Sequence, residues 1–348
     1  MPEIIINGRS IGPNHSPFII AEAGINHNGE LEKALQMVGV AKQAGADVIK
    51  FQTFKADEFI GDPNQQYTYL SQGREITESM LNMFRRYELS RNAWFEIKSE
   101  CDRQDILFMS TPQNRSDLDL LLEIGIPAIK VGSDDFTNLP LLRSYAETCL
   151  PIILSCGMSD LADVYRSLET IGALDGYPTV LMLCTSQYPT PHEDVNLRKL
   201  FTLQNAFPFI VLGFSDHTQG VMASSMAVAY GASAFEKHFT LSHHLPGPDH
   251  WFSEDINGLA DWIKHIHIAL EILGSAIVRP THYEKLNKKE FQRVLVASEE
   301  LSTGDILTPS KIAMRRIPGG IGLPATFSDL IIGHRVNRHY SPGEVLEL

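Results

Sequence analysis

Two histidines stand in similar surroundings in this sequence, and together they could bind a divalent metal ion. His217 and His238 each follow a short apolar stretch and two polar residues. Neutral imidazole nitrogens are common ligands of divalent transition metals, and the carboxylates of Glu22 and Asp249 could lie near them. Two histidine ligands leave positions open for water and a substrate oxygen, which Lewis-acid catalysis requires. Loop histidines that only form hydrogen bonds are the alternative.

Two lysines at the ends of apolar runs, Lys50 and Lys130, indicate a site for an anionic substrate. The chain has a formal net charge of -13, so an anion can bind only where cations gather locally. Lysine charges and Ser or Thr hydroxyls suit a phosphate or a carboxylate, although a salt bridge is the simpler role for either lysine. Polar residues in comparable places are Gln52, Thr111, Ser133, Asp135, Ser186, Tyr188, Ser215 and Glu236.

The elements that must position these residues form a repeat of short apolar runs and segments of helical periodicity. Eight such runs predict a parallel sheet covered by helices, and eight strands close a (β/α)8 TIM barrel. Active sites of these barrels lie at the C-terminal ends of the strands. An open doubly wound sheet is disfavoured because the first turn, Glu22-Ala-Gly-Ile-Asn-His27, lacks a GxGxxG pattern. The predicted strands are residues 18–21, 47–51, 106–109, 128–131, 152–154, 180–183, 210–212 and 234–235.

The pattern changes after the last helical segment, where a second, smaller domain is predicted. Residues 1–275 form the barrel domain, 276–290 a charged linker, and 291–348 a mostly β domain. A domain of this size buries little surface, so we expect it to dock against a partner. The insertion at 56–86 has no distinct pattern and could be a substrate lid or a dimer contact.

Composition excludes several classes of protein. An acidic chain with a pI of about 5.4 lacks the basic surface that nucleic acids and anionic membranes require. The 4 cysteines form no CxxC pair, which argues against zinc-ribbon and thioredoxin-like proteins. The sequence begins with no secretion signal, and no apolar run approaches the length of about 18 residues needed to span a membrane. A cytoplasmic protein is therefore expected.

With these residues in view, the sequence resembles the nonulosonate (sialic acid) synthase family over essentially its whole length. The C-terminal part resembles the antifreeze-like (SAF) domain of that family. Several motifs occur in the family's order, which makes the resemblance specific. They are Ile20-Ala-Glu-Ala-Gly-Ile-Asn-His-Asn-Gly29, Gly45-Ala-Asp-Val-Ile-Lys-Phe-Gln-Thr53, Tyr188-Pro-Thr-Pro191, Gly213-Phe-Ser-Asp-His-Thr218, Glu236-Lys-His-Phe-Thr240 and Gly247-Pro-Asp249.

The resemblance implies a C–C bond-forming transferase of the N-acetylneuraminate synthase type. Such an enzyme condenses phosphoenolpyruvate with an N-acylated amino sugar, similar to N-acetylmannosamine, in its open-chain aldehyde form. The product is a nonulosonic acid such as N-acetylneuraminate or legionaminate, and phosphate is released. The implied cofactor is a divalent ion, Mn2+ or else Mg2+ or Co2+. The implied assembly is a domain-swapped homodimer in which the SAF domain caps the partner's barrel.

The resemblance also implies a role for each candidate residue. His217 and His238 would bind the metal, and Glu22 would act at the reacting centre as a general acid or base. Arg316, with Arg315 as its substitute, would reach the acylamino end of the sugar in the neighbouring protomer. Residues holding phosphoenolpyruvate would be Lys50, Gln52, Thr111, Lys130, Ser133, Ser186 and Ser215. Residues contacting the sugar, or supporting that contact, would be Asp135, Tyr188, Glu236 and Asp249.

Departures from the family pattern leave the identity of the sugar open. After Lys130 the chain has Gly-Ser-Asp134-Asp135 where relatives commonly have Gly-Ser-Gly-Glu, so the last carboxylate is one methylene shorter. Ser186 stands where several relatives have Asn, and Gln113-Asn114 stands where an apolar Phe is frequent. These changes lie in loops that would face the substrate.

Two other functions are therefore kept beside the leading one. The first is a phosphoenolpyruvate-dependent aldol synthase that uses a different aldose for a surface or spore-coat polysaccharide. The second is a barrel that has lost catalysis and serves as a scaffold. The scaffold is disfavoured because it would not need Glu22, both lysines and both histidines together.

Overall fold

The computed structural model describes residues 2–347, and the chain divides into two compact units, Met1–Gly274 and Ser275–Leu348. Each unit is built around a buried apolar cluster of its own. The stretch 276–290, predicted to be a linker, contains most of helix α12 (His282–Phe291), none of whose residues is buried. Its charged residues are compatible with a helix because Thr281 and Glu284 form a capping box at its start.

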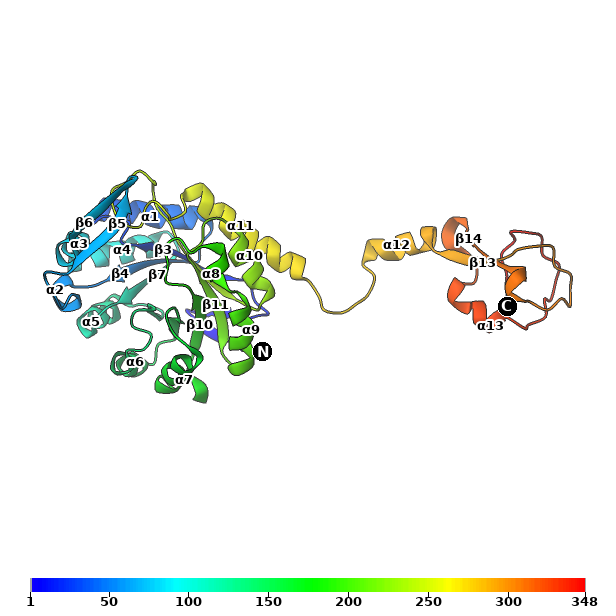
Figure 1. Ribbon diagram of the computed structural model, residues 1–348, viewed down its shortest axis with the longest axis horizontal. Coiled ribbons are helices and arrows are strands. Elements are labelled where there is room, and N and C mark those ends of the chain that lie inside the picture. The colour runs from blue at the N-terminus through cyan, green and yellow to red at the C-terminus, as the bar shows by residue number, and fades with distance from the viewer. Residues whose placement is uncertain (1, 348) are drawn as a thin grey trace. The chain divides into compact units, whose positions relative to one another are not determined.

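An eight-stranded parallel sheet forms the centre of the first unit (Figure 1). Its strands are β3 (Phe18–Gly24), β4 (Val48–Thr53), β7 (Leu107–Pro112), β8 (Ile129–Val131), β9 (Ile152–Ser155), β10 (Thr179–Cys184), β11 (Val211–Asp216) and β12 (Ala234–His238). They lie in the order β7-β4-β3-β12-β11-β10-β9-β8, and the end strands β7 and β8 pack side by side. The sheet is thus a nearly closed barrel, which confirms the predicted fold.

Helices surround the barrel, and their ends follow local sequence signals. The first helix ends at Gly45, which takes a left-handed conformation with φ 94° that costs glycine little. Two further helices begin with capping boxes, formed by Asn114 with Asp117 and by Asp160 with Asp163. The outer helices are α1 (Leu31–Ala44), α4 (Arg91–Arg103), α5 (Arg115–Ile124), α6 (Leu139–Ala146), α7 (Leu161–Thr170), α9 (Arg198–Ala206), α10 (Met222–Ala229) and α11 (Ile256–Leu273).

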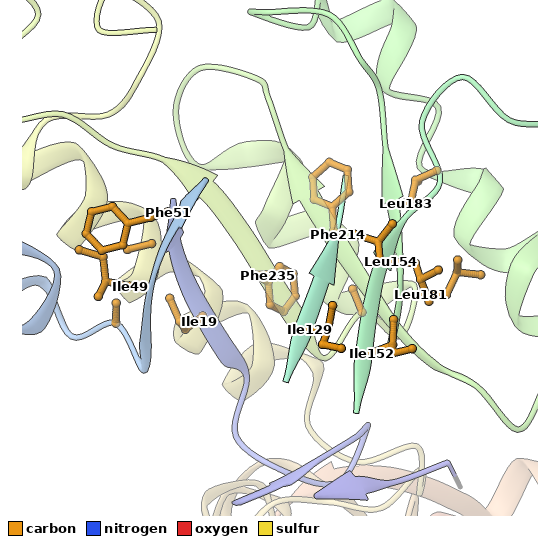
Figure 2. Packing of buried hydrophobic residues seen from close by; sticks show 14 of the residues in the cluster. Ile19, Ile49, Phe51, Ile129, Ile152, Leu154, Leu181, Leu183, Phe214 and Phe235 are labelled. Carbon is orange, nitrogen blue, oxygen red and sulfur yellow. The ribbon is translucent and has the colours of Figure 1, made fainter. Parts of the chain in front are cut away.

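Alternation along the strands divides the apolar side chains of the barrel into two clusters. Side chains that point outward, such as Ile19, Ile49 and Phe235, pack beneath the helices (Figure 2). Side chains that point inward fill the barrel near the N-terminal ends of the strands. They are Phe18, Ile20, Val48, Met109, Ala128, Ile153, Val180, Met182, Val211 and Ala234.

A short hairpin at the start of the chain completes the inner cluster. Its strands are β1 (Ile4–Ile6) and β2 (Arg9–Ile11), and the fully buried Ile6 and Ile11 belong to the inner cluster. Apolar side chains therefore fill the N-terminal end of the barrel. Polar side chains are left to the opposite end, where chemistry is expected.

The insertion after β4, whose role the sequence left open, folds into ordered elements. They are α2 (Ala56–Phe59), the antiparallel hairpin β5 (Gln66–Ser71) and β6 (Arg74–Ser79), and α3 (Met80–Tyr87), as Figure 1 shows. The hairpin tip is tied to the loop after β12, because Gln72 donates to the His244 carbonyl over 2.7 Å and Ser71 Oγ accepts from Gly247 over 3.0 Å. The insertion thus belongs to the C-terminal end of the barrel.

The second unit is a small β-containing domain that begins with α12. Strands β13 (Arg293–Ala297) and β14 (Ile312–Arg316) pair antiparallel, and α13 (Ser328–Ile331) follows. Isolated bridges, such as Leu301 with Tyr340, connect its turns. Its core consists of Leu295, Ala297, Leu301, Leu307, Ile331, Val336, Tyr340 and Leu346.

Candidate active site

A cavity of about 930 Å³ opens at the C-terminal ends of the barrel strands. Strand ends form its floor, and the β5–β6 hairpin and the loop after β12 contribute to its walls. All but two of the residues predicted from the sequence meet here. They are Glu22, Lys50, Gln52, Thr111, Lys130, Ser133, Ser186, Tyr188, Ser215, His217, Glu236, His238 and Asp249.

The pleat of the strands explains why these polar side chains share one cavity. In β4, Lys50 and Gln52 point into the barrel, while Phe51 between them points outward into the core beneath the helices. In the same way, β12 presents Glu236 and His238 to the cavity. The outward-pointing neighbours, such as Phe51, hold the strands that carry the polar residues.

Two lysines and two carboxylates form a buried ionic network on the cavity floor. Lys50 Nζ lies 2.8 Å from Glu22 Oε2 and 3.6 Å from Glu236 Oε2, and Lys130 Nζ lies 3.6 Å from Glu236 Oε1. All four side chains are buried. When all four side chains are ionised, the two positive and two negative charges balance. Buried charges are tolerated only when they are paired in this way.

Burial and charge separate the proton affinities of the two carboxyl groups. Burial raises the pKa of Glu22 to about 7, although Lys50 acts against it. Burial also acts to raise the pKa of Glu236, but Lys130 and Lys50 outweigh it and hold that pKa at about 2. Near neutral pH, Glu22 can therefore hold or release a proton while Glu236 stays ionised. Titratable groups separated in this way are typical of acid–base sites.

Hydroxyl groups complete the surroundings of both lysines. Lys50 Nζ donates to Thr111 Oγ1 over 3.2 Å, and Lys130 Nζ donates to Ser155 Oγ over 2.8 Å. Protonation of Glu22 would leave the Lys50 charge in excess. An anion entering the cavity would then meet ammonium groups and hydroxyl donors together, the combination that binds carboxylate and phosphate strongly.

A glycine keeps room for two more hydroxyl groups. A Cβ atom on Gly157 would clash with Ser186 Oγ and lie 2.6 Å from Ser133 Oγ, so a larger residue would push both hydroxyl groups out of their positions. Ser133 Oγ also accepts from the Gly157 amide over 3.1 Å. Both serines line the cavity beside Lys130, and they extend its polar floor.

His217 and His238 lie close together at the cavity, with ring centroids 5.6 Å apart. His217 Nδ1 lies 2.8 Å from the Thr185 carbonyl, which can only accept, so Nδ1 carries a proton. Burial acts to lower the pKa of His217, but Cys184 and the Thr185 carbonyl outweigh burial and hold that pKa above its usual value. Burial holds the pKa of His238 well below its usual range, and its buried Nδ1 has no hydrogen-bond partner. His238 therefore offers a nitrogen lone pair, and His217 offers Nε2 once its ring has released the second proton.

This pair fits a divalent metal ion in donor type and spacing. Metal–nitrogen bonds of about 2 Å allow rings at this separation to share one ion with small adjustments. Among residues 2–347, no three His, Cys, Asp or Glu side chains converge as a complete metal site would need. Glu22 lies beside His238 as its partner on the adjacent strand β3, and its carboxylate interacts with Lys50 and with Gln52 Nε2 at 3.3 Å. Water and substrate would have to supply the other ligands.

Aromatic rings and one carboxyl group form the wall beside the histidines. The Tyr188 ring centroid lies 4.1 Å from that of His217, and the Phe252 centroid lies 5.5 Å from that of His238. Burial raises the pKa of Asp249 to about 6. The cavity thus combines an ionic floor with an aromatic side, a combination suited to a small polar ligand.

The two units match two known protein families. Residues 37–278 match the NeuB family, and residues 292–347 match the SAF domain. The chain belongs to the NeuB family. The predicted resemblance is thereby confirmed for both units, and membership makes the chain an enzyme of the sialic and legionaminic acid synthase kind.

Relatives of this NeuB-family chain match it almost from end to end. An N,N'-diacetyllegionaminic acid synthase of Legionella pneumophila is 35% identical over 347 residues, covering 98% of this chain and 96% of the relative. The solved N-acetylneuraminic acid synthetase of Leptospira borgpetersenii is 31% identical, with a TM-score of 0.74 over 81% of this chain and 94% of that one. The spore coat polysaccharide biosynthesis protein spsE of Bacillus subtilis is 30% identical, with a TM-score of 0.68 over 99% and 98%.

Two predicted substrate residues, Asp135 and Arg316, are not among the residues that line this cavity, and Arg316 was predicted to act in the neighbouring protomer. Asp135 turns toward the start of α6, where its Oδ1 accepts from Asn138 Nδ2 over 2.8 Å, and the neighbouring Asp134 lines the cavity instead. Arg316 lies on β14 in the second unit, with its guanidinium 5.7 Å from the Phe291 ring centroid. Its backbone partner in the hairpin is Arg293.

The hairpin insertion supplies cavity residues that the sequence did not reveal. Tyr67 and Tyr69 project from β5 with stacked rings 5.7 Å apart, and Met83 and Phe84 of α3 continue the same wall. The alternation of aromatic residues in β5 is the one sequence feature that could have indicated this wall. Their spacing predicts a shared strand face but not that this face lines the cavity.

None of the helices between residues 2 and 347 combines the length and apolar character of a membrane span.

Proposed function

We propose that this enzyme condenses phosphoenolpyruvate with the open-chain aldehyde of an N-acylated amino sugar. The observation that carries the proposal is the buried network of two lysines and two carboxylates beside two adjacent histidines. The product is a nonulosonic acid, with N-acetylneuraminate and legionaminate as the leading examples. The names of the relatives support this class of product.

Phosphoenolpyruvate occupies the ionic floor. Lys50 and Lys130 balance its charges, and the hydroxyl groups of Thr111, Ser133 and Ser186 donate to its oxygens. Protonation of Glu22 accompanies binding, because its pKa of about 7 lets it accept a proton when the anion competes for Lys50. The remaining predicted contacts in this region are Gln52 and Ser215.

The reaction forms one C–C bond and one C–O bond from water, and it breaks the C–O bond to phosphate; the protons that water gives up go to the aldehyde oxygen and to the departing phosphate. Carbon 3 of phosphoenolpyruvate attacks the aldehyde carbon, and the aldehyde oxygen becomes a hydroxyl group by taking up a proton. Water adds to carbon 2, and the bond between carbon 2 and the bridging oxygen breaks to release phosphate. Glu22 lies beside both lysines and titrates near neutral pH, so we assign it the proton transfers.

His217 and His238 hold a divalent ion, Mn2+ in our proposal, with Mg2+ or Co2+ as alternatives. When bound, the ion supplies Lewis acidity to the aldehyde oxygen. The protein's own part is to present two imidazoles, one of them oriented by the Thr185 carbonyl. Tyr188 and Asp249 lie beside these rings and line the space for the sugar.

A second copy of the chain completes the sugar site in this proposal, as a domain-swapped homodimer. The SAF domain of one protomer caps the barrel of its partner, and Arg316 reaches the acylamino group. Charge supports such docking, because residues 275–348 carry ten Lys and Arg against eight Asp and Glu, while the whole chain carries 29 against 42. Helix α12 also exposes Tyr283, Leu286 and Phe291, which a partner surface could cover.

A second candidate uses the same chemistry on a different aldose, for a surface or spore-coat polysaccharide. Its support is the match to the Bacillus subtilis spsE structure over nearly the whole of both chains. The presence of Asp134 rather than Asp135 at the cavity also permits a different sugar.

Phosphate release tests the proposal. Purified protein is incubated with phosphoenolpyruvate, Mn2+ and a panel of N-acyl hexosamines and other aldoses. We expect release that depends on one of the N-acyl amino sugars. Release only with another aldose would favour the second candidate, and none with any sugar, from folded and metal-loaded protein, would reject both.

A further inference from the structure

A buried ion pair lies directly behind the two histidines and takes no part in lining the cavity. Asp216 precedes His217, and Lys237 precedes His238, so strand alternation points both charged side chains away from the cavity. Asp216 Oδ2 and Lys237 Nζ are 3.1 Å apart, and the two residues are only 1% and 2% exposed. The pair connects neighbouring strands β11 and β12.

The ion pair fixes the backbone on both sides of His217. Asp216 Oδ1 accepts from the Thr218 amide over 2.9 Å and from Thr218 Oγ1 over 2.7 Å, which closes a tight turn around His217. Lys237 Nζ donates to the Thr218 carbonyl over 2.5 Å. The turn that carries one histidine is therefore bonded to the residue next to the other histidine.

Helices hold the ion pair in place. Asp216 Oδ2 also accepts from Ser224 Oγ of α10 over 2.6 Å, and Ser224 Oγ accepts from Trp262 Nε1 of α11 over 2.8 Å. Glu254, 3.9 Å from Lys237 Nζ, donates its amide to the His238 carbonyl over 2.9 Å. The Thr218 turn that follows His217 and the backbone of His238 are thus bonded to the same group of residues.

A buried ion pair is a costly way to stabilise a fold, because apolar residues of similar size often do as well. The hydrogen bonds of this ion pair are directional, so they fix the positions of neighbouring residues more than they add to the stability of the fold. We propose that Asp216 and Lys237 are positioning residues that hold the imidazoles of His217 and His238 at the separation needed to share one divalent ion. This inference rests on the proposed metal site.

Binding of Mn2+ alone tests this role apart from activity. Free Mn2+ is followed by electron paramagnetic resonance while it is titrated into the full-length wild-type protein and three variants. Asp216→Asn removes the charge, and Thr218→Val removes one hydroxyl bond of the turn without altering any charge. We expect both to weaken Mn2+ binding by about tenfold or more, as losses of groups that orient metal ligands do. Thr218→Ser keeps the hydroxyl and should bind as the wild type does.

A matched control lies at the opposite end of the barrel. Asp47 pairs with Arg9 and accepts from the Ile19 amide over 2.8 Å, so Asp47→Asn should lower thermal stability and leave Mn2+ affinity unchanged. Folded Asp216→Asn and Thr218→Val proteins with wild-type Mn2+ affinity would overturn the inference. If Asp216→Asn fails to fold, Thr218→Val decides alone. A wild-type protein that releases phosphate but binds no Mn2+ would instead reject the metal site, and the inference with it.

Discussion

At the residue scale, the site works by giving chemically similar groups different surroundings. Glu22 and Glu236 contact the same lysine, yet one has a pKa of about 7 and the other of about 2, because Glu236 also faces Lys130. Glu22 can therefore exchange a proton near neutral pH, while Glu236 stays ionised and balances the lysine charges. Such a division suits an enzyme that must bind an anion and move a proton at the same pH.

The histidine pair carries a direct prediction. His217→Ala or His238→Ala should weaken Mn2+ binding and lower turnover by more than about 100-fold. Loss of a group that only orients a metal ligand lowers affinity or activity by up to about 100-fold, and loss of the ligand itself should cost more. Titration calorimetry with Mn2+ and the phosphate assay measure the two effects. His265→Ala, on an exposed helix position, is the control and should change neither. Full activity in either site variant would remove the metal assignment.

A third histidine predicts how acid affects the fold. Burial, aided by His250, lowers the pKa of His27 from 6.5 to about 3, so the folded protein keeps this ring neutral. The unfolded chain takes up the proton below pH 6.5, so the stability contributed by His27 is lost as pH falls from there toward 3. Between pH 7 and 5 this linkage costs roughly 2 kcal/mol.

Replacing this ring tests the linkage. His27→Gln keeps an acceptor for the Gly29 amide but cannot titrate. Urea unfolding at pH 7 and pH 5 should show a smaller loss of unfolding free energy in this variant than in the wild type. Equal losses in both proteins would show that His27 is not kept neutral.

At the element scale, strand ends could be predicted and loops could not. Apolar runs ending in Lys50, Lys130 and Glu236 located the cavity floor, because a buried parallel strand needs a continuous apolar sequence and a barrel brings all its strand ends together. Asp135 was predicted at the cavity, but Asn138 at the start of α6 binds it and Asp134 takes the place. A shift of one residue along the loop decides which of the two aspartates faces the cavity, and the periodicity of the sequence does not predict loop conformation.

The β5–β6 hairpin, opaque in the sequence, should determine affinity for the sugar. Replacing residues 67–78 with Gly-Gly is feasible because the Met80 amide already bonds to the Gln65 carbonyl over 2.9 Å. The loss of Tyr67 and Tyr69 from the wall should raise KM for the amino sugar about tenfold, the effect of roughly 1.4 kcal/mol. KM for phosphoenolpyruvate should stay near the wild-type value, since its lysines belong to the barrel. Equal changes in both KM values would argue for general disruption.

At the scale of the whole molecule, the chain joins an acidic barrel to a C-terminal domain with a small positive balance. The sequence placed the change of pattern near residue 275 because strand and helix repeats end there. It could not reveal that a helix occupies the predicted linker, because α12 has only three large apolar residues, Tyr283, Leu286 and Phe291, among charged ones, too few to show a helical period. Motifs, rather than the barrel, pointed to the reaction, because one barrel architecture serves many chemistries.

Removal of residues 286–348 tests the role of the second domain. The barrel keeps its own core, so circular dichroism should show a folded protein with a cooperative melt. Use of the sugar should be lost, and light scattering should show a monomer in place of the dimer that we propose for the full-length protein. A truncated protein with full activity would refute the capping role.

The fate of one oxygen atom tests the central claim most directly. Phosphoenolpyruvate labelled with 18O at the bridging position is incubated with the full-length enzyme, Mn2+ and the accepted sugar, and the products are analysed by mass spectrometry. Cleavage between carbon 2 and the bridging oxygen must place all the label in phosphate, together with an organic product that contains the carbons of both substrates. Label retained in an organic product, or phosphate formed without a new C–C bond, would contradict the account.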